Sequence, residues 1–209
     1  MDTNSSSKRL LGLIALLAWF AIIVQLLLMI DARVTSIFET TIRYFSFFTI
    51  LTNLLVAIYS AVLVIHPLSS WGLFFSRLSV GTATTVYIVV VGLIYNTILR
   101  FQWQPEGMQR VVDELLHAII PALFLLYWFF FLSKKQLAWN AFIPWLIYPF
   151  LYCVYILVRG SFSGFYPYPF MDVMKLGYPT VIINSLGVTA AFLGFSLLFL
   201  LIGKIRSSK

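Results

Sequence analysis

Long apolar stretches alternate with short polar connections along this chain of 209 residues. An α-helix needs about 20 apolar residues to cross a hydrocarbon core, and six stretches meet that length. The pattern predicts helices over residues 10–30, 44–65, 78–99, 111–132, 141–158 and 178–202. Because the connections are short, neighbouring helices should run antiparallel within one domain that covers residues 1–209. The predicted fold class is all-α, a polytopic integral membrane protein built as a six-transmembrane-helix bundle.

Composition supports a membrane protein and excludes several kinds of site. Hydrophobic residues make up 61% of the chain, whereas a soluble domain is about half apolar. The first apolar stretch is too long for a signal peptide and has no small-residue cleavage site, so we expect it to be retained. The single cysteine, Cys153, excludes an intramolecular disulfide. No Cys/His spacing matches a metal site, so we predict neither a metal nor a cofactor.

Charge gives an expected orientation and an expected partner. The net charge is +7. With both termini in the cytoplasm, that side carries eight basic residues against six on the other side, which favours this orientation. The eight are Lys8, Arg9, Arg77, Lys134, Lys135, Lys204, Arg206 and Lys209. The positive charge then reflects topology and attraction to anionic membrane lipids, and no nucleic acid partner is predicted.

Polar residues gather at one depth of the predicted bundle. His117 lies about 10 Å below Arg110 along the fourth helix, and Thr49 lies about 9 Å below Arg43 along the second. Ionisable groups in a membrane usually face the bundle interior and indicate a functional site. We therefore expect Thr49 and His117 to meet across the bundle.

Helical spacing places candidate supporting residues beside both Thr49 and His117. Asp113 and Glu114 are four and three residues before His117, so either carboxylate can reach the imidazole, and Asp113 is preferred as the group that orients it. Thr52 and Asn53 extend a polar stripe from Thr49 along the second helix. The simpler interpretation is that such residues only join helices, and for Thr49 alone that would be the default. Pro121 also removes the N–H that would bond to the carbonyl of His117, so we expect a kink or a bound water there.

Three segments resemble a known family. They are YFSFFTILTNLL (residues 44–55), LLHAIIP (115–121) and YPFLYCVYILVRG with YPYPFMD (148–160 and 166–172). The sequence resembles the androgen-induced protein family of six-helix membrane hydrolases, and more closely its prokaryotic relatives. The similarity covers most of the chain and four of the six predicted helices. It implies a bacterial cell membrane as the location.

The resemblance also implies an activity and the residues that perform it. Family members cleave esters of hydroxylated fatty acids with an intramembrane Thr and His. These correspond to Thr49, which follows Phe47-Phe48, and to His117, with Thr52 as a competing nucleophile. The YPYPFMD stretch corresponds to an aromatic-proline-acid segment of the family. This stretch is expected to cover the cavity, with Tyr168 and Asp172 among the substrate-binding residues.

The resulting hypothesis is an intramembrane hydrolase of lipid or fatty-acyl esters. His117, oriented by Asp113, would take the proton of Thr49 Oγ as that atom attacks the ester carbonyl. Asn53 is a candidate donor to the oxyanion. Arg159 is a candidate partner for a fatty-acid carboxylate, and Asn184 is a further substrate-binding candidate.

Two other function classes remain open at this stage. In the first, the same pocket holds a lipid or a small solute without reaction, for binding or transport, and His117 acts as a switch near neutral pH. In the second, the protein is an assembly partner without a ligand, which predicts a solid interior between Thr49 and His117.

Overall fold

The computed structural model describes residues 5–102, 104–132 and 137–207, and every element within these ranges is helical. Six helical segments are long enough and apolar enough to cross a membrane, which indicates a multi-pass membrane protein. They are Ser5–Asp31, Phe48–Ile65, Leu78–Gln102, Gly107–Leu132, Trp139–Ser163 and Val173–Ser207. The predicted all-α bundle is confirmed.

Several of these segments combine different helix types. In chain order the elements are α1 (Ser5–Asp31), α2 (Ile37–Tyr44), α3 (Phe48–Ile65), α4 (Ser70–Phe75), α5 (Leu78–Ile94), η1 (Tyr95–Leu99), η2 (Arg100–Gln102), α6 (Gly107–Glu114), η3 (Leu115–Ile119), α7 (Ile120–Tyr127), η4 (Trp128–Leu132), η5 (Trp139–Phe142), η6 (Pro144–Leu146), α8 (Ile147–Ser163), η7 (Pro169–Met171) and α9 (Val173–Ser207). The elements η1, η3 and η4 are π-helical turns within longer helices, a feature that is frequent at functional sites.

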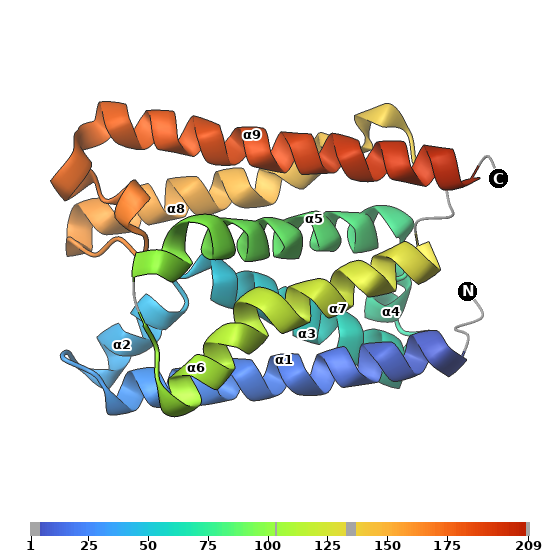
Figure 1. The fold of residues 1–209 in the computed structure, drawn as a ribbon, viewed down its shortest axis with the longest axis horizontal. Coiled ribbons are helices and arrows are strands. Elements are labelled where there is room, and N and C mark those ends of the chain that lie inside the picture. The colour runs from blue at the N-terminus through green and yellow to red at the C-terminus, as the bar shows by residue number, and fades with distance from the viewer. Residues whose placement is uncertain (1–4, 103, 133–136, 208–209) are drawn as a thin grey trace.

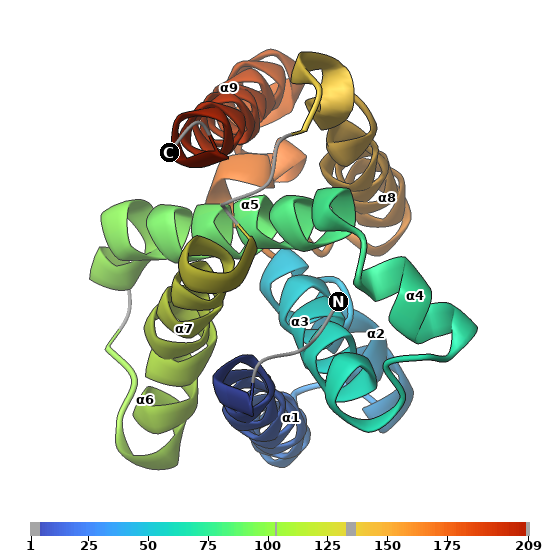
Figure 2. The same cartoon turned by 90° about the vertical axis from the view of Figure 1, so that its right-hand side faces the viewer.

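Helix α5 lies at the centre of the bundle (Figures 1 and 2). It contacts α3 and α7 on one side and α9 on the other, and α1 packs against both α3 and α7. The first residue of α1 and the last of α9 lie at the same end of the bundle (Figure 1). We call this the terminal end. The opposite end, which we call the cap end, carries α2 and residues 164–172. We call residues 164–172 the cap segment.

Helix α2 lies in a stretch that the hydropathy pattern leaves as a connection. Its first turn is capped by Ser36, whose hydroxyl accepts a hydrogen bond from the Glu39 N–H at 3.2 Å. Tyr44 ends α2, and its hydroxyl donates to the carbonyl of Ile22 at 2.6 Å. The second membrane segment therefore begins at Phe48, after this short helix, instead of at Tyr44.

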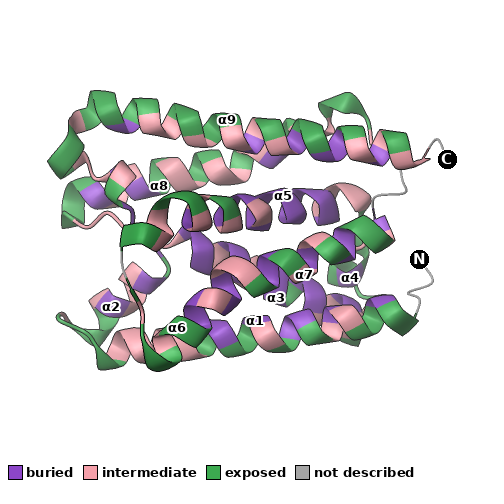
Figure 3. Ribbon diagram, viewed as in Figure 1, coloured by how far each residue is buried: buried purple, intermediate pink, exposed green. Residues whose placement is uncertain are grey.

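Burial follows the central position of α5 (Figure 3). Most of α5 is buried, whereas α8 and α9 expose long apolar faces, as expected for helices that contact acyl chains. Three threonines of α5 are nonetheless accommodated, because the hydroxyls of Thr82, Thr84 and Thr85 each donate to a carbonyl one turn earlier. This bonding satisfies the hydroxyls without a ligand.

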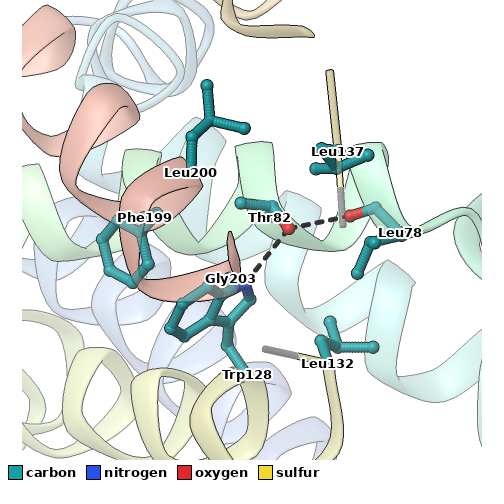
Figure 4. Close-up of a pocket in the computed structure, with 8 residues that line it drawn as sticks. All are labelled: Leu78, Thr82, Trp128, Leu132, Leu137, Phe199, Leu200 and Gly203. Atoms are coloured by element: carbon teal, nitrogen blue, oxygen red, sulfur yellow. Dashed lines mark hydrogen bonds between the residues drawn. The ribbon is translucent and has the colours of Figure 1, made fainter. Parts of the chain in front are cut away.

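A small hollow at the terminal end is part of the packing (Figure 4). Trp128 Nε1 donates to Thr82 Oγ1 at 3.0 Å, and the Trp128 ring meets Phe199 edge to face at 4.4 Å. The hollow beside them has a volume of about 10 Å³. Since one water molecule needs about that much space, this hollow is too small for a ligand.

The cap segment is fastened to α8 by a close approach at Gly160. A Cβ atom built on Gly160 would overlap the ring of Tyr166, which packs directly on this glycine. The cap segment begins at Gly164, whose positive φ of 65° ends α8 in a conformation that suits glycine. These two glycines allow the chain to fold back over the end of α8.

Replacing Gly160 by Ala should therefore loosen the cap segment. The added methyl group forces the rigid Tyr166 ring to move, and such overpacking usually costs about 1–3 kcal/mol. We expect a lower melting temperature and faster proteolysis within residues 164–172. Gly194→Ala is the matched control, because a Cβ there meets nothing within 4 Å. Equal melting temperatures for the two variants would contradict this account of Gly160.

Candidate functional site

A large apolar cavity extends from the cap segment along α8, between α3, α5, α8 and α9. Its volume is about 580 Å³, within the range of ligand pockets. Exposed apolar residues of the fifth and sixth membrane segments, including Ile147, Phe150 and Leu186, border it, so the cavity opens on the face where acyl chains would lie. The few polar side chains in its wall are Thr49, Tyr95, Tyr152, Cys153, Tyr168, Ser185 and Thr189.

Thr49 stands in the first turn of α3 and meets Tyr168 of the cap segment. Its Oγ1 lies 3.4 Å from Tyr168 Oη, and its N–H donates to the same oxygen at 3.3 Å. Burial raises the pKa of Tyr168, which keeps the phenol protonated. Since Oη already accepts from a backbone N–H, its proton can be donated to Thr49 or to a ligand.

Thr52 and Asn53 lie behind Thr49 and do not line the cavity. Thr52 is fully buried, and its Oγ1 lies 3.3 Å from Tyr148 Oη. Asn53 Nδ2 donates to the carbonyls of Thr49 at 2.9 Å and Leu116 at 3.2 Å. Its amide nitrogen is thus engaged in joining α3 to η3. Of the two candidate nucleophiles, Thr49 is the one at the cavity wall.

His117 lies in the π-helical turn η3 and forms a cluster with Asp113 and Tyr95. Its Nδ1 lies 2.9 Å from the Asp113 carbonyl and 3.3 Å from Asp113 Oδ1. Both neighbours are oxygen acceptors, so Nδ1 is the ring nitrogen that donates to Asp113. The Tyr95 hydroxyl donates to Asp113 Oδ2. The carboxylate of Asp113 is therefore buried between a phenol and an imidazole.

Tyr95 separates His117 from the cavity. Its ring stacks on the imidazole with centroids 3.8 Å apart and planes 13° apart, and it also lines the cavity. His117 does not line the cavity, and within the described residues no hydrogen bond joins it to Thr49. The structure brings Asp113 and His117 together, and it brings Thr49 and Tyr168 together, as two neighbouring pairs.

The carbonyls around His117 are bonded by amides from other helices. The Ile120 N–H reaches back to Leu115, one residue further than in an α-helix. Asn53 bonds to the carbonyl of Leu116, and Asn96 Nδ2 bonds to that of His117 at 3.0 Å. We expected a kink or a bound water at the carbonyl released by Pro121, and in the structure its partner is the side-chain amide of Asn96.

The remaining predicted substrate-binding residues have structural partners. Arg159 Nη2 donates to Glu39 Oε1 at 2.9 Å, and Arg159 does not line the cavity. Asp172 accepts hydrogen bonds from the N–H groups of Met174 and Lys175, and so caps the start of α9. Asn184 Nδ2 donates to the carbonyl of Phe170 at 2.9 Å, which ties α9 to the cap segment. Their roles toward a substrate stay predictions.

Two tyrosines of the cavity wall are absent from the sequence-based site. Tyr95 lies in the last turns of the third predicted helix beside other polar residues, and Tyr152 lies in the fifth, where it donates to the carbonyl of Ser46 at 2.8 Å. Tyrosines near helix ends usually mark the membrane interface, so their positions alone do not indicate a site. The spacing of Tyr95 to Asp113 is visible only in three dimensions.

Metal chemistry has no candidate site in the part of the chain that the structure describes, because no three His, Cys, Asp or Glu side chains come together there. Searches of family models, curated proteins and solved structures found no match to this chain.

Proposed function

We propose that this protein is an intramembrane hydrolase of lipid esters, with Thr49 as nucleophile and His117 as general base. The observation that carries the proposal is the Thr49 hydroxyl in the wall of an apolar cavity of about 580 Å³ that opens toward acyl chains. The resemblance to the androgen-induced protein family points to the same two residues. The Asp113–His117 contact supplies an oriented imidazole.

The proposed reaction uses groups that lie at or beside the cavity. An acyl chain fills the cavity and places its ester carbonyl beside Thr49. Thr49 Oγ attacks the carbonyl carbon while its proton passes to His117 Nε2, and the Tyr168 hydroxyl donates to the oxyanion. The carbon–oxygen bond to the leaving alcohol breaks, and His117 returns the proton to that alcohol. Water, deprotonated by His117, then attacks the acyl-threonine, which releases the fatty acid and restores Thr49.

Proton transfer in this scheme requires a path past Tyr95. Its ring covers one face of the imidazole at the cavity wall. A change of its rotamer, or a water molecule between Thr49 and His117, would complete the path. Catalytic hydrogen bonds are often long before substrate binds, so the lack of a direct Thr49–His117 hydrogen bond in the described structure is compatible with His117 as the general base.

A second candidate function is lipid or small-solute binding, or transport, without reaction. The observation that favours it is that His117 neither lines the cavity nor bonds to Thr49 in the described structure. In this case the cavity would hold an intact ligand.

The proposed location is a bacterial cell membrane, with both termini in the cytoplasm. The even number of candidate spans and the shared end of α1 and α9 support termini on one side (Figure 1). The basic residues at the terminal end favour the cytoplasm for that side.

Thr49→Ala should abolish ester cleavage, whereas Thr52→Ala should not. Loss of the nucleophile typically lowers kcat by about 10⁴-fold or more. Thr52→Ala removes the same hydroxyl one helical turn away, outside the cavity. The measurement is release of fatty acid from a panel of acyl esters by the purified protein. Loss of activity in Thr52→Ala alone would reverse the assignment.

Tyr168→Phe should lower kcat by about 10²-fold, with a smaller effect on KM. Removal of one oxyanion donor has an effect of about this size. Tyr148→Phe is the matched control, because it removes a phenol that bonds Thr52 and does not line the cavity. Steady-state kinetics on one ester would compare the two. Equal kinetic constants in both variants would contradict the role of Tyr168.

His117→Ala should separate the two candidate functions. A hydrolase should lose cleavage in this variant while the cavity still retains lipid, because His117 lies outside the cavity wall. Mass spectrometry of co-purified lipids would measure retention alongside activity. A wild-type protein that keeps its ester intact for hours would instead support binding without reaction.

A further inference from the structure

Two arginines share one carboxylate oxygen at the cap end, away from the cavity. Arg43 Nε donates to Glu39 Oε1 at 2.8 Å, and Arg159 Nη2 donates to the same atom at 2.9 Å. Both guanidinium groups also lie over the ring of Phe165, 4.7 and 5.2 Å from its centroid. We call these four residues the arginine cluster. It joins α2, α8 and the cap segment.

The arginine cluster carries one uncompensated positive charge. Hydrogen bonding to Arg43, together with Arg159, lowers the pKa of Glu39, so this carboxylate remains charged and neutralises one of the two guanidinium groups. Asp172 is the only other acid near the cap segment that forms an ion pair within the described residues, and its partner is Lys175. The excess charge therefore remains available to an anion.

The arginine cluster also keeps unused hydrogen-bond donors. Arg43 bonds through Nε alone, so its two Nη groups have no partner within the described structure, and its side chain is 28% exposed. Arg159 is only 10% exposed, and its buried Nε has no hydrogen-bond partner. Buried donors without partners are rare in native structures, and an unplaced ion or water is a common reason.

The position of the arginine cluster matches the depth of lipid headgroups. Arg43 lies five residues before Phe48, where the second membrane segment begins, and Arg159 lies four residues before the fifth segment ends at Ser163. The rings of Phe47 and Tyr168 lie between Phe165 of the cluster and the cavity, with centroids 6.3 Å apart for Phe165 and Phe47 and 5.9 Å apart for Phe47 and Tyr168. The site is thus separate from the one where Thr49 lies.

We propose that the arginine cluster binds the phosphate group of an anionic lipid headgroup. A guanidinium group presents paired N–H donors that match phosphate oxygens, and the stacking on Phe165 holds both groups in place. Anionic lipids supply phosphate at this depth together with a net negative charge. The alternative is that the cluster is only an ion-paired connection between α2 and α8, which needs no lipid.

The test compares lipids and charge variants in the purified full-length protein. Thermal unfolding is measured in detergent micelles with increasing phosphatidylglycerol or phosphatidylcholine, and a third arm adds inorganic phosphate to phosphatidylcholine. Phosphatidylglycerol should stabilise the wild-type protein most. Arg43→Gln should weaken its apparent binding about fivefold, the usual effect of one basic residue near a lipid surface.

Arg110→Gln is the matched control, because it removes one exposed positive charge at the same end, outside the arginine cluster. Arg43→Lys is a second variant that keeps the charge beside Glu39 but loses the paired N–H donors of the guanidinium group. It should bind phosphatidylglycerol more weakly than the wild type. Equal weakening in Arg43→Gln and Arg110→Gln would overturn the proposal, as would equal stabilisation by the two lipids. Full stabilisation by inorganic phosphate alone would overturn the assignment to a lipid.

Discussion

Backbone carbonyls inside a bilayer need hydrogen-bond partners within the protein, and this requirement fixes the region around His117. Pro121 has no N–H to offer the carbonyl of His117, and Asn96 of the neighbouring segment bonds to it instead. Asn53 of α3 bonds to the preceding carbonyl, that of Leu116. Three membrane segments are thereby joined at one turn. The position of the imidazole follows from this backbone bonding.

Tyrosines meet the same requirement elsewhere in the bundle. The hydroxyls of Tyr44, Tyr87 and Tyr152 each donate to a carbonyl of a distant segment, at 2.6, 2.7 and 2.8 Å. Each ring also fills apolar space between helices. The membrane segments are therefore joined by polar bonds in otherwise apolar surroundings. Helices α8 and α9 nonetheless keep exposed apolar faces.

The sequence predicts the helical class because six long apolar stretches allow few alternatives. It does not predict α2 from hydropathy, since Ile37–Tyr44 is short and mixed, although Ser36 and Glu39 have the spacing of a helix cap. Within the candidate site, the pairing of Asp113 with His117 follows from a separation of four residues on one helix. The place of Tyr95 depends on how two segments pack, and no spacing along the chain encodes that contact.

The position of the predicted residue Arg159 shows the same limit of linear spacing. Its charge and depth suit a fatty-acid carboxylate, but the fold places Glu39 of α2 beside it. Contacts between residues on one helix can thus be predicted from their spacing in the sequence. Contacts between residues on different helices depend on how the helices pack. Thr49 and Tyr168 are an example, since 119 residues separate them along the chain.

The exposed apolar border of the cavity changes how a ligand would be supplied. Because Ile147, Phe150 and Leu186 are exposed apolar residues at the border of the cavity, the lipid of the proposed function would arrive by lateral diffusion, and its availability would depend on its mole fraction among the surrounding lipids. Its concentration in water has little influence. Detergent tails used for purification would have access to the same opening, so they would compete with the proposed lipid in measurements made in micelles.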